Sequence, residues 1–157
     1  MDKSEFTQRV TDMRDRLYRV TCGMLRERQD RLDAVQEAVL RAWAKRDGLR
    51  NEDYFETWLT RILINECRNL QRVQRRVVPL ESVQVPAADG DIDVPLRDAV
   101  LALDEKLRLP VILHYMNGYS VAEEARILRL PEGTVKTRLR KARGELRKML
   151  AEEGRAI

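Results

Sequence analysis

Cysteine and histidine are scarce in this 157-residue chain, and their scarcity excludes several kinds of site. The two cysteines, Cys22 and Cys67, lie far apart and form no CxxC pair. This argues against a disulfide framework or a zinc site and predicts two buried thiols in a reducing compartment. The single histidine, His114, excludes a multi-histidine metal centre. We therefore expect no metal and no cofactor.

Glycine, proline and long apolar runs are also scarce. Seven Gly and five Pro, with 43% apolar and 36% charged residues, favour a charge-rich helical protein over a disordered chain, a collagen or a β-sandwich. No apolar run approaches the roughly 18 residues of a membrane span, and the N-terminal MDKSEFTQRV is too polar for a signal peptide. We expect a cytoplasmic protein of one ordinary domain or two small ones.

Charge is unevenly distributed along the chain, although the net charge is only +4. Residues 1–54 carry a net charge of +1, residues 55–77 carry +3, residues 78–104 carry −5 and residues 105–157 carry +5. Two basic segments thus flank an acidic one. This segregation points to binding of a polyanion, with a merely charge-rich surface as the alternative.

The first part of the chain, residues 1–77, predicts a unit of three helices. Apolar residues in a four–three alternation predict one long helix that buries Phe6, Val10, Met13, Leu17, Val20 and Met24. A second helix is expected over Leu32–Ala44, with an inward face of Val35, Val39 and Ala42. The polar stretch Lys45–Tyr54 predicts a loop, and a third helix is expected from Phe55 to Arg76.

Residues 78–95 predict an extended acidic linker, because they contain three prolines, Gly90 and several aspartates. Residues 96–157 predict a second helical unit. One helical stripe is expected from Leu96, Val100, Leu103 and Leu107, and another helix is expected to follow Pro110 and stop at Asn117-Gly118. The predicted fold is therefore all-α, with two small helical domains joined by a flexible acidic linker.

A helix-turn-helix is expected within the second unit. Ser120 and Glu123 form a capping box that starts a helix with Val121, Ala125 and Leu128 inward. Arg129–Pro131 reads as a tight turn, and a last helix follows over Glu132–Leu150. Its apolar sector predicts the buried face Val135, Leu139, Ala142, Leu146 and Met149.

The outer face of this last helix is strongly basic. The window Thr134–Lys148 holds seven basic residues and one acidic residue. In a helix-turn-helix the second helix enters the major groove, where basic and hydroxyl side chains reach base edges or phosphates. This pattern predicts a DNA-reading helix, with a solvated basic face as the alternative; the residues expected to contact DNA are Lys136, Thr137, Arg140 and Lys141.

The helix expected over Phe55–Arg76 separates its side chains in the same way. Its apolar sector is Phe55, Trp58, Leu59, Ile62 and Leu70. On another face four arginines and an asparagine recur at four- and three-residue steps, which suits a phosphate backbone: Arg61, Asn65, Arg68, Arg72 and Arg76. Asn65 and Asn69 are both able to contact bases. The alternative is an exposed basic face that serves only solubility. Glu66 points toward the apolar sector and is expected to have a structural partner.

The second helix carries a different surface, and no catalytic motif is found. Asp33, Gln36, Glu37 and Leu40 cluster away from its core side, and a leucine among acids is a candidate protein-binding patch. A single exposed leucine is, however, also common. There is no GxxxxGK[ST], GxGxxG or Cys/His cluster. His114 and Ser120 have structural explanations, so no enzymatic activity is expected.

Three runs of residues resemble bacterial sigma factors of the extracytoplasmic-function type. They are DAVQEAVLRAWAK (Asp33–Lys45), FETWLTRILINECRN (Phe55–Asn69) and GYSVAEEARILRLPEGTVKTRLRKARGELRKML (Gly118–Leu150). Their order, with an acidic linker between the second and third, is highly specific. The sequence departs from the family at Arg129, where a glycine is frequent in the turn, and at Glu124, where the family usually has an apolar residue.

The resemblance implies a function for each surface. The first unit would bind core RNA polymerase through Asp33, Gln36, Glu37 and Leu40. It would open the −10 promoter element with Asp47–Tyr54 capturing a flipped base and with a recognition helix presenting Arg61, Asn65, Arg68 and Asn69. Arg72, on the basic face of the same helix, is also expected to contact this DNA. The second unit would read the −35 element through Lys136, Thr137, Arg140 and Lys141. The resemblance also implies a linker that passes through the polymerase, and an anti-sigma partner that is often a membrane protein.

Two other interpretations of the sequence remain open at this point. A stand-alone helix-turn-helix regulator with a dimerising or ligand-sensing N-terminal domain would bind duplex DNA without polymerase, but leaves the DAVQE surface and the acidic linker unexplained. A fragment of a DNA recombinase would need a catalytic Ser or Tyr among arginines in a separate domain, which this sequence lacks. We expect a sigma factor that performs no catalysis itself.

Overall fold

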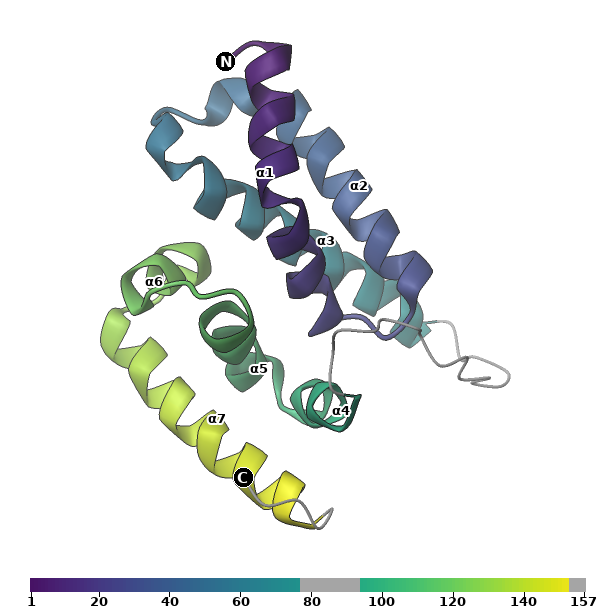
Figure 1. Ribbon diagram of the computed structural model, residues 1–157, viewed down its shortest axis with the longest axis vertical. Coiled ribbons are helices and arrows are strands. Elements are labelled where there is room, and N and C mark those ends of the chain that lie inside the picture. The colour runs from purple at the N-terminus through teal and green to yellow at the C-terminus, as the bar shows by residue number, and fades with distance from the viewer. Residues whose placement is uncertain (77–93, 153–157) are drawn as a thin grey trace. The chain divides into compact units, whose positions relative to one another are not determined.

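The computed structural model describes residues 1–76 and 94–152. The chain divides into two compact units, Met1–Ala88 and Asp89–Ile157. Every element within the described residues is helical (Figure 1), so the all-α prediction is confirmed. Most of the predicted linker, residues 78–93, lies outside the described residues, whereas Val94 and Pro95 already belong to the first helix of the second unit.

The first unit consists of three mutually packed helices, α1 (Lys3–Cys22), α2 (Arg28–Ala44) and α3 (Phe55–Arg76). The Asp2 carboxylate caps α1 by accepting a hydrogen bond from the Glu5 N–H at 2.8 Å. The loop between α2 and α3 contains two 3₁₀ turns, η1 (Arg46–Gly48) and η2 (Glu52–Tyr54). The predicted bounds of α3 are confirmed. Helix α2 begins one turn earlier than expected, because its charged first turn gave no apolar periodicity to follow.

The buried face of α2 differs from the prediction. Val35 and Val39 are only half-buried, and Ala42 alone of the expected inward residues is fully buried. The face that enters the core is formed by Arg31, Ala34, Ala38 and Ala42. Three alanines at four-residue spacing allow α2 to lie close to its neighbours, since the interaxial distance depends on side-chain size at the contact. The larger valines flank this contact.

Arg31 is the buried charge that sequence periodicity missed. Its Nη1 donates to the backbone carbonyls of Leu25 at 3.1 Å and Arg26 at 2.6 Å, and its Nε donates to the Tyr18 hydroxyl at 3.3 Å. The guanidinium therefore supplies donors to two carbonyls in the turn between α1 and α2, of which the bond to Leu25 is buried and the bond to Arg26 is part-buried. It fixes the entry of the chain into α2.

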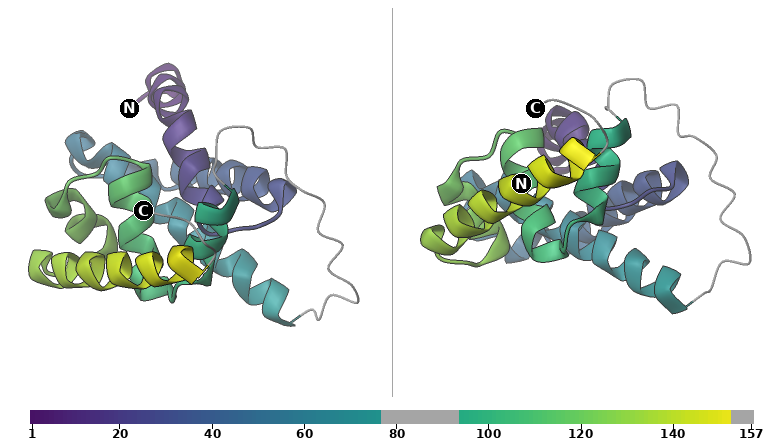
Figure 2. Two further views of the ribbon diagram at one scale, coloured as in Figure 1. Left: turned by 60° about the horizontal axis from the view of Figure 1, so that its bottom comes forward. Right: turned by 90° about the horizontal axis from the view of Figure 1, so that it is seen from below.

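The second unit is built from shorter helices around a long last one: α4 (Val94–Ala102), α5 (Glu105–Val111), the π-helical turn η3 (Ile112–Met116), α6 (Val121–Leu128) and α7 (Glu132–Glu152). Helix α7 packs against α4, α5 and α6, as the two views of Figure 2 show. The expected stripe from Leu96 to Leu107 is not one helix, because the chain breaks at Leu103-Asp104 and α5 starts anew. Leu103 and Leu107 are nonetheless both buried.

Pro110 lies inside α5, although it was expected to precede a helix. Proline has no N–H to donate and crowds the preceding turn. The π-helical turn follows directly, as is typical where the regular hydrogen-bond ladder is interrupted. The predicted stop at Asn117-Gly118 is confirmed, with Gly118 at a φ of 71° and Asn117 Nδ2 donating to the Ile112 carbonyl at 2.9 Å.

The helix-turn-helix is present, with one change in its buried face. The capping box is confirmed: the Glu123 N–H donates to Ser120 Oγ at 3.1 Å, and the Ser120 N–H donates to Glu123 Oε1 at 3.0 Å. The expected inward residues Val121, Ala125 and Leu128 are only half-buried. Glu124 and Ile127 are the buried ones, because the α6 face turned toward the core is rotated by about one residue.

Candidate nucleic-acid interface

Helix α7 presents the predicted basic face to the outside. Its core side is formed by the buried Val135, Leu139 and Ala142. The Pro131 carbonyl accepts hydrogen bonds from the N–H groups of Thr134 and Val135 at 3.0 and 3.2 Å, and thereby starts the helix. The four predicted contact residues are all exposed: Lys136, Thr137, Arg140 and Lys141.

The Thr137 hydroxyl has a defined orientation on this face. Its Oγ1 donates to the Gly133 carbonyl at 2.9 Å, one turn earlier in α7. Since the hydrogen is used within the helix, the group offers a partner its acceptor lone pairs. Toward DNA it is therefore suited to accept from a base amino group, whereas the three basic side chains supply donors.

Helix α3 carries the second basic face, and its residues differ in exposure. Asn65, Asn69 and Arg72 are exposed, whereas Arg61 and Arg68 are half-buried. Arg68 Nη1 donates to Asn65 Oδ1 at 3.4 Å, so these two side chains are held beside one another. The side chain of Arg76 lies outside what the structure describes. The sequence placed the five described residues correctly on one side of the helix, but it did not reveal the contact between Asn65 and Arg68.

The expected partner of Glu66 is Arg41 of α2. Arg41 Nε lies 2.6 Å from Glu66 Oε1 and 3.4 Å from Glu37 Oε1. The buried carboxylate of α3 is thus neutralised by a side chain that also contacts Glu37 of the exposed patch on α2. The adjacent Cys67 is fully buried, and burial together with the Glu66 charge raises the pKa of its thiol to about 12. The thiol stays protonated and unreactive.

The exposed patch on α2 is larger than the sequence indicated. Asp33, Gln36 and Glu37 are exposed, and Leu40 is 57% exposed. Leu32 is 42% exposed and lies two turns before Leu40 on the same side of the helix. The four-residue spacing of Leu32, Gln36 and Leu40 was the sequence signal that would have placed Leu32 in this patch. Two leucines among acidic and amide groups are suited to bind another protein.

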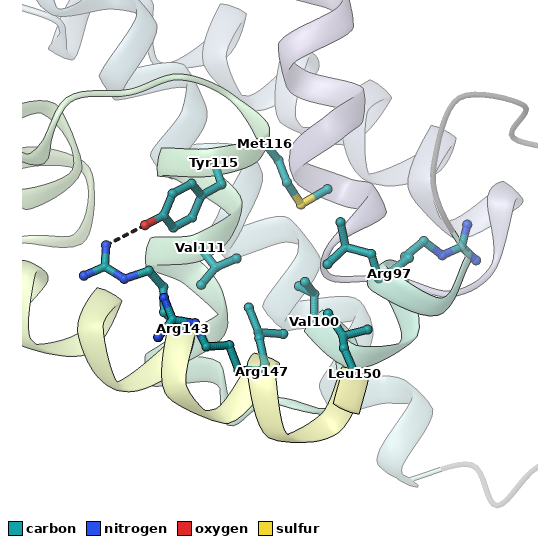
Figure 3. A pocket seen from close by; sticks show the side chains of 10 residues that line it. Arg97, Val100, Val111, Tyr115, Met116, Arg143, Arg147 and Leu150 are labelled. Carbon is teal, nitrogen blue, oxygen red and sulfur yellow. Dashed lines mark hydrogen bonds between the residues drawn. The ribbon is translucent and has the colours of Figure 1, made fainter. Parts of the chain in front are cut away.

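The second unit contains an apolar groove of about 370 Å³, shown in Figure 3. Side chains from α4, α5, η3 and α7 line it, and the apolar ones are Leu96, Val100, Val111, Met116, Leu146 and Leu150. Arg97, Arg143 and Arg147 also line it. Arg143 is oriented by donating to the Tyr115 hydroxyl at 2.6 Å. The groove is suited to an apolar segment that carries acidic side chains, because the charged lining groups are positive.

A contact between two titratable side chains, one of them fully buried, supports the helix-turn-helix from inside. His114 Nδ1 lies 2.8 Å from Oε2 of the fully buried Glu124. Burial raises the pKa of Glu124, an effect that the hydrogen bond and the charge of His114 oppose. The pair explains both the single histidine and the charged residue at this helix position. Both groups have structural roles here.

The described part of the chain holds neither a metal-ligand cluster nor a helix that could span a membrane. Within residues 1–76 and 94–152 no three His, Cys, Asp or Glu side chains come together as a metal-ligand set. None of the helices in this part of the chain combines the length and apolarity needed to cross a bilayer. Cys22 and Cys67 are both buried free thiols, as predicted.

Comparison with known proteins identifies the family. The family model of sigma-70 region 2 matches residues 10–77, and that of sigma-70, region 4 matches residues 93–146. The extracytoplasmic-function RNA polymerase sigma factor SigM of Mycobacterium tuberculosis is 34% identical over 157 residues, which cover 95% of this chain and 79% of that protein. The chain belongs to the extracytoplasmic-function sigma factors of RNA polymerase. This sigma factor directs promoter-specific transcription initiation by RNA polymerase.

Other relatives agree with this assignment. SigW of Bacillus subtilis is 28% identical over 96% of this chain and 91% of its own length, and the sigma-E factor of Escherichia coli is 33% identical over 71% of this chain and 69% of its own. Among solved structures, the sigma factor RpoE of Bartonella quintana, in complex with the anti-sigma factor NepR, has a TM-score of 0.79 at 28% identity. That match covers 94% of this chain and 97% of RpoE.

A second solved structure supports the fold alone. CnrH, in complex with the cytosolic domain of CnrY, has a TM-score of 0.76 at 23% identity. The match covers 96% of this chain and 90% of CnrH. The region 2 match begins within α1 and includes α2 and α3, and the region 4 match includes the helix-turn-helix. The residues expected to contact DNA on α3 and α7 thus lie within the region 2 and region 4 matches respectively.

Proposed function

We propose that this sigma factor recognises two promoter elements, the −35 element through α7 and the −10 element through α3, and binds core polymerase through α2. The observation that carries the proposal is the exposed row of Lys136, Thr137, Arg140 and Lys141 on the second helix of a helix-turn-helix within the region 4 match. Basic and hydroxyl side chains on such a helix contact base edges and phosphates. The protein itself performs no catalysis.

The −10 element is assigned to α3 and the loop before it. Arg61, Asn65, Arg68, Asn69 and Arg72 form a face of donors within the region 2 match, suited to DNA. The preceding loop, Asp47–Tyr54, is exposed except for the half-buried Leu49, so its side chains are available to an unpaired base. Functionally, residues 1–77 act as the polymerase and −10 domain, residues 78–95 as the acidic linker and residues 96–157 as the −35 domain.

Core polymerase is assigned to the patch on α2 formed by Leu32, Asp33, Gln36, Glu37 and Leu40. Its two leucines supply apolar surface and its carboxylates supply charge for a basic partner surface. Because the relevant polymerase is in the cytoplasm, this sigma factor acts there.

An anti-sigma factor is the second protein partner that we propose, because RpoE of Bartonella quintana was solved with one. The apolar groove of the second unit, with Arg97, Arg143 and Arg147 in its lining, is suited to an amphipathic acidic segment of such a partner. A membrane-anchored partner of this kind is compatible with the proposal.

The test is binding of the full chain to core polymerase and to promoter DNA. The double variant Glu37→Lys/Leu40→Asp should weaken core binding at least tenfold, through lost apolar burial and reversed charge. Val73→Asp is the matched control, because Val73 is also 57% exposed but lies on α3. Equal core affinity of wild type and double variant contradicts the α2 assignment. Tight, specific binding to duplex promoter DNA without polymerase would instead favour a stand-alone regulator.

A further inference from the structure

We infer that Arg9 of α1 is a positioning residue for the loop Asp47–Tyr54, which it holds in place by fixing the turn η2 at the end of that loop. The inference rests on the proposed function of this loop at the −10 element. Arg9 lies one residue before the region 2 match, which begins at residue 10. The family comparison therefore assigns it no role.

The contacts of Arg9 converge on the last turn of the loop. Its Nη1 donates to the backbone carbonyl of Glu52 at 3.0 Å, and its Nη2 lies 3.4 Å from the Glu52 carboxylate. Nη2 also donates to Glu5, one turn earlier on α1, at 3.0 Å. The guanidinium carbon stands 5.5 Å from the ring centroid of Phe55, the first residue of α3. One side chain therefore connects α1, the turn η2 and the start of α3.

The contact with the backbone is the decisive one. The Glu52 carbonyl also accepts the Phe55 N–H, which closes the turn. The guanidinium is a charged donor, so its hydrogen bond to this carbonyl is stronger than a neutral one. Because the acceptor is backbone, the bond does not depend on the side chain at position 52. Within the same turn Asn51 Oδ1 accepts the Asp53 N–H at 3.0 Å, and Thr57 Oγ1 donates to the Tyr54 carbonyl at 3.1 Å. The exposed Tyr54 thus projects from a turn that is held on both sides.

The start of the loop is anchored in a similar way, on the same aromatic cluster. The Arg46 guanidinium lies 3.7 Å from the Trp43 ring centroid, and its Nη1 donates to the Trp43 carbonyl at 2.8 Å. The Trp43 and Phe55 rings lie 5.1 and 5.8 Å from Phe6. Both loop ends therefore rest on Phe6 of α1, one turn from Arg9. A loop with fixed ends meets a base without first having to be ordered.

The geometry fits arginine better than lysine at this position. Arg9 uses two nitrogens to reach three acceptors, a fork that the single ammonium of lysine does not reproduce. The ion pairs themselves contribute little, because both partners are partly exposed. The expected effect of losing Arg9 is therefore on the placement of the loop, with little effect on the stability of the unit.

The experiment uses the full chain with core polymerase and a promoter that carries 2-aminopurine in its −10 element. Fluorescence of this base reports unstacking as the element opens. Arg9→Gln should lower the rate of this signal about fivefold, the effect of one ordinary solvent-exposed hydrogen bond, and Arg9→Lys should restore it in part. Affinity for core polymerase and for a −35 duplex should not change.

Arg16→Gln is the matched control. Arg16 of the same helix also pairs with the start of the third helix, through Glu56 at 2.7 Å. It should leave the 2-aminopurine signal within twofold of wild type. If Arg16→Gln and Arg9→Gln lower the signal equally, Arg9 acts only as a structural tie and the inference is overturned.

Two loop variants separate this inference from the proposed function on which it rests. Tyr54→Ala and Asn51→Ala change the loop itself and should lower the signal. If they do so while Arg9→Gln behaves as wild type, the inference is wrong and the loop assignment stands. If neither loop variant changes the signal, the assignment of the loop to the −10 element is wrong, and the role of Arg9 is overturned with it.

Discussion

The two helical units bury charged side chains in different ways. In the first unit the fully buried Arg31 donates to two carbonyls and a hydroxyl, and the buried Glu66 pairs with Arg41 at 2.6 Å. In the second unit Glu124 is fully buried, yet only its Oε2 meets His114, and its Oε1 has no hydrogen-bond partner among the described residues. A buried polar atom without a partner costs free energy of folding. The first unit has matched its buried charges more completely.

The helices of the second unit are also shorter and less regular than those of the first. The helices α1, α2 and α3 are 20, 17 and 22 residues long. In the second unit α7 has 21 residues, but α4, α5 and α6 have nine, seven and eight, with Pro110 inside α5 and a π-helical turn after it. Arg129 is in the left-handed region at a φ of 54°. The comparison predicts a more stable first unit and a second unit whose stability depends more on pH.

The largest expected effect is the loss of stability of the first unit when its buried Arg31 is replaced. Arg31→Met should destabilise this unit by about 3 kcal/mol, because it removes the donor from the buried carbonyl of Leu25 and from the part-buried carbonyl of Arg26. Hydrogen exchange followed by mass spectrometry resolves the two units within the full chain. Protection should fall in α1 and α2 and stay unchanged in α7. Unchanged protection in α1 would show that the buried arginine contributes nothing net.

The basic helices of the two units should differ in what they recognise. Arg140→Ala in α7 should cost about 1–3 kcal/mol of binding at particular −35 sequences only, if Arg140 contacts a base. Arg72→Ala in α3 should weaken binding on all sequences and lower the salt slope by about one, as expected for a phosphate contact. Both follow from holoenzyme binding to two −35 sequences over a salt series. Equal loss on both sequences for Arg140→Ala makes it a phosphate contact.

The next prediction concerns Glu124, the buried carboxyl group of the second unit. The folded-state pKa of Glu124 is raised above its ordinary value of 4.5, mainly by burial. The contribution of this group to stability is therefore fully present below pH 4.5 and is lost as the pH rises through the raised pKa. Glu124→Leu should remove this loss and stabilise the second unit by about 1–2 kcal/mol at pH 8.

Unfolding of wild type and variant between pH 4 and pH 8 checks this prediction, since their difference reports the carboxylate together with its hydrogen bond to His114. Glu124→Gln is the control that retains a polar group facing His114 and removes the charge. Its free energy of unfolding should depend less on pH than that of wild type. If Glu124→Leu instead destabilises at every pH, the bond to His114 outweighs the cost of burial.

The smallest effect is expected in the turn of the helix-turn-helix. Arg129→Gly should stabilise the second unit by at most about 1 kcal/mol, because glycine adopts a positive φ without the steric cost that a Cβ brings. The gain is partly offset by the greater freedom of glycine in the unfolded chain. Thermal unfolding measures it, with Arg126→Gly, inside α6, as a control that should destabilise.

The sequence alone determined the bounds of α3 and the outward face of α7, the two helices proposed to contact DNA. Periodicity placed α3 from Phe55 to Arg76 and assigned Lys136, Thr137, Arg140 and Lys141 to the exposed side of α7. It succeeded because an amphipathic pattern is local: neighbouring turns of one helix share a face regardless of what covers it. The capping box at Ser120 was equally predictable, since both of its hydrogen bonds lie within four residues.

Only the tertiary structure decided which charged groups are buried and what they meet. Arg31 and Glu124 look like surface residues in a list of residue types, and the break at Leu103-Asp104 lies within an uninterrupted apolar stripe. Arg9 and Glu52 are separated by 43 residues, so nothing local indicates their contact. The physical reason is that the burial of a charge is tolerated only where a partner is supplied, and that partner comes from a distant segment whose position depends on the packing of the whole unit.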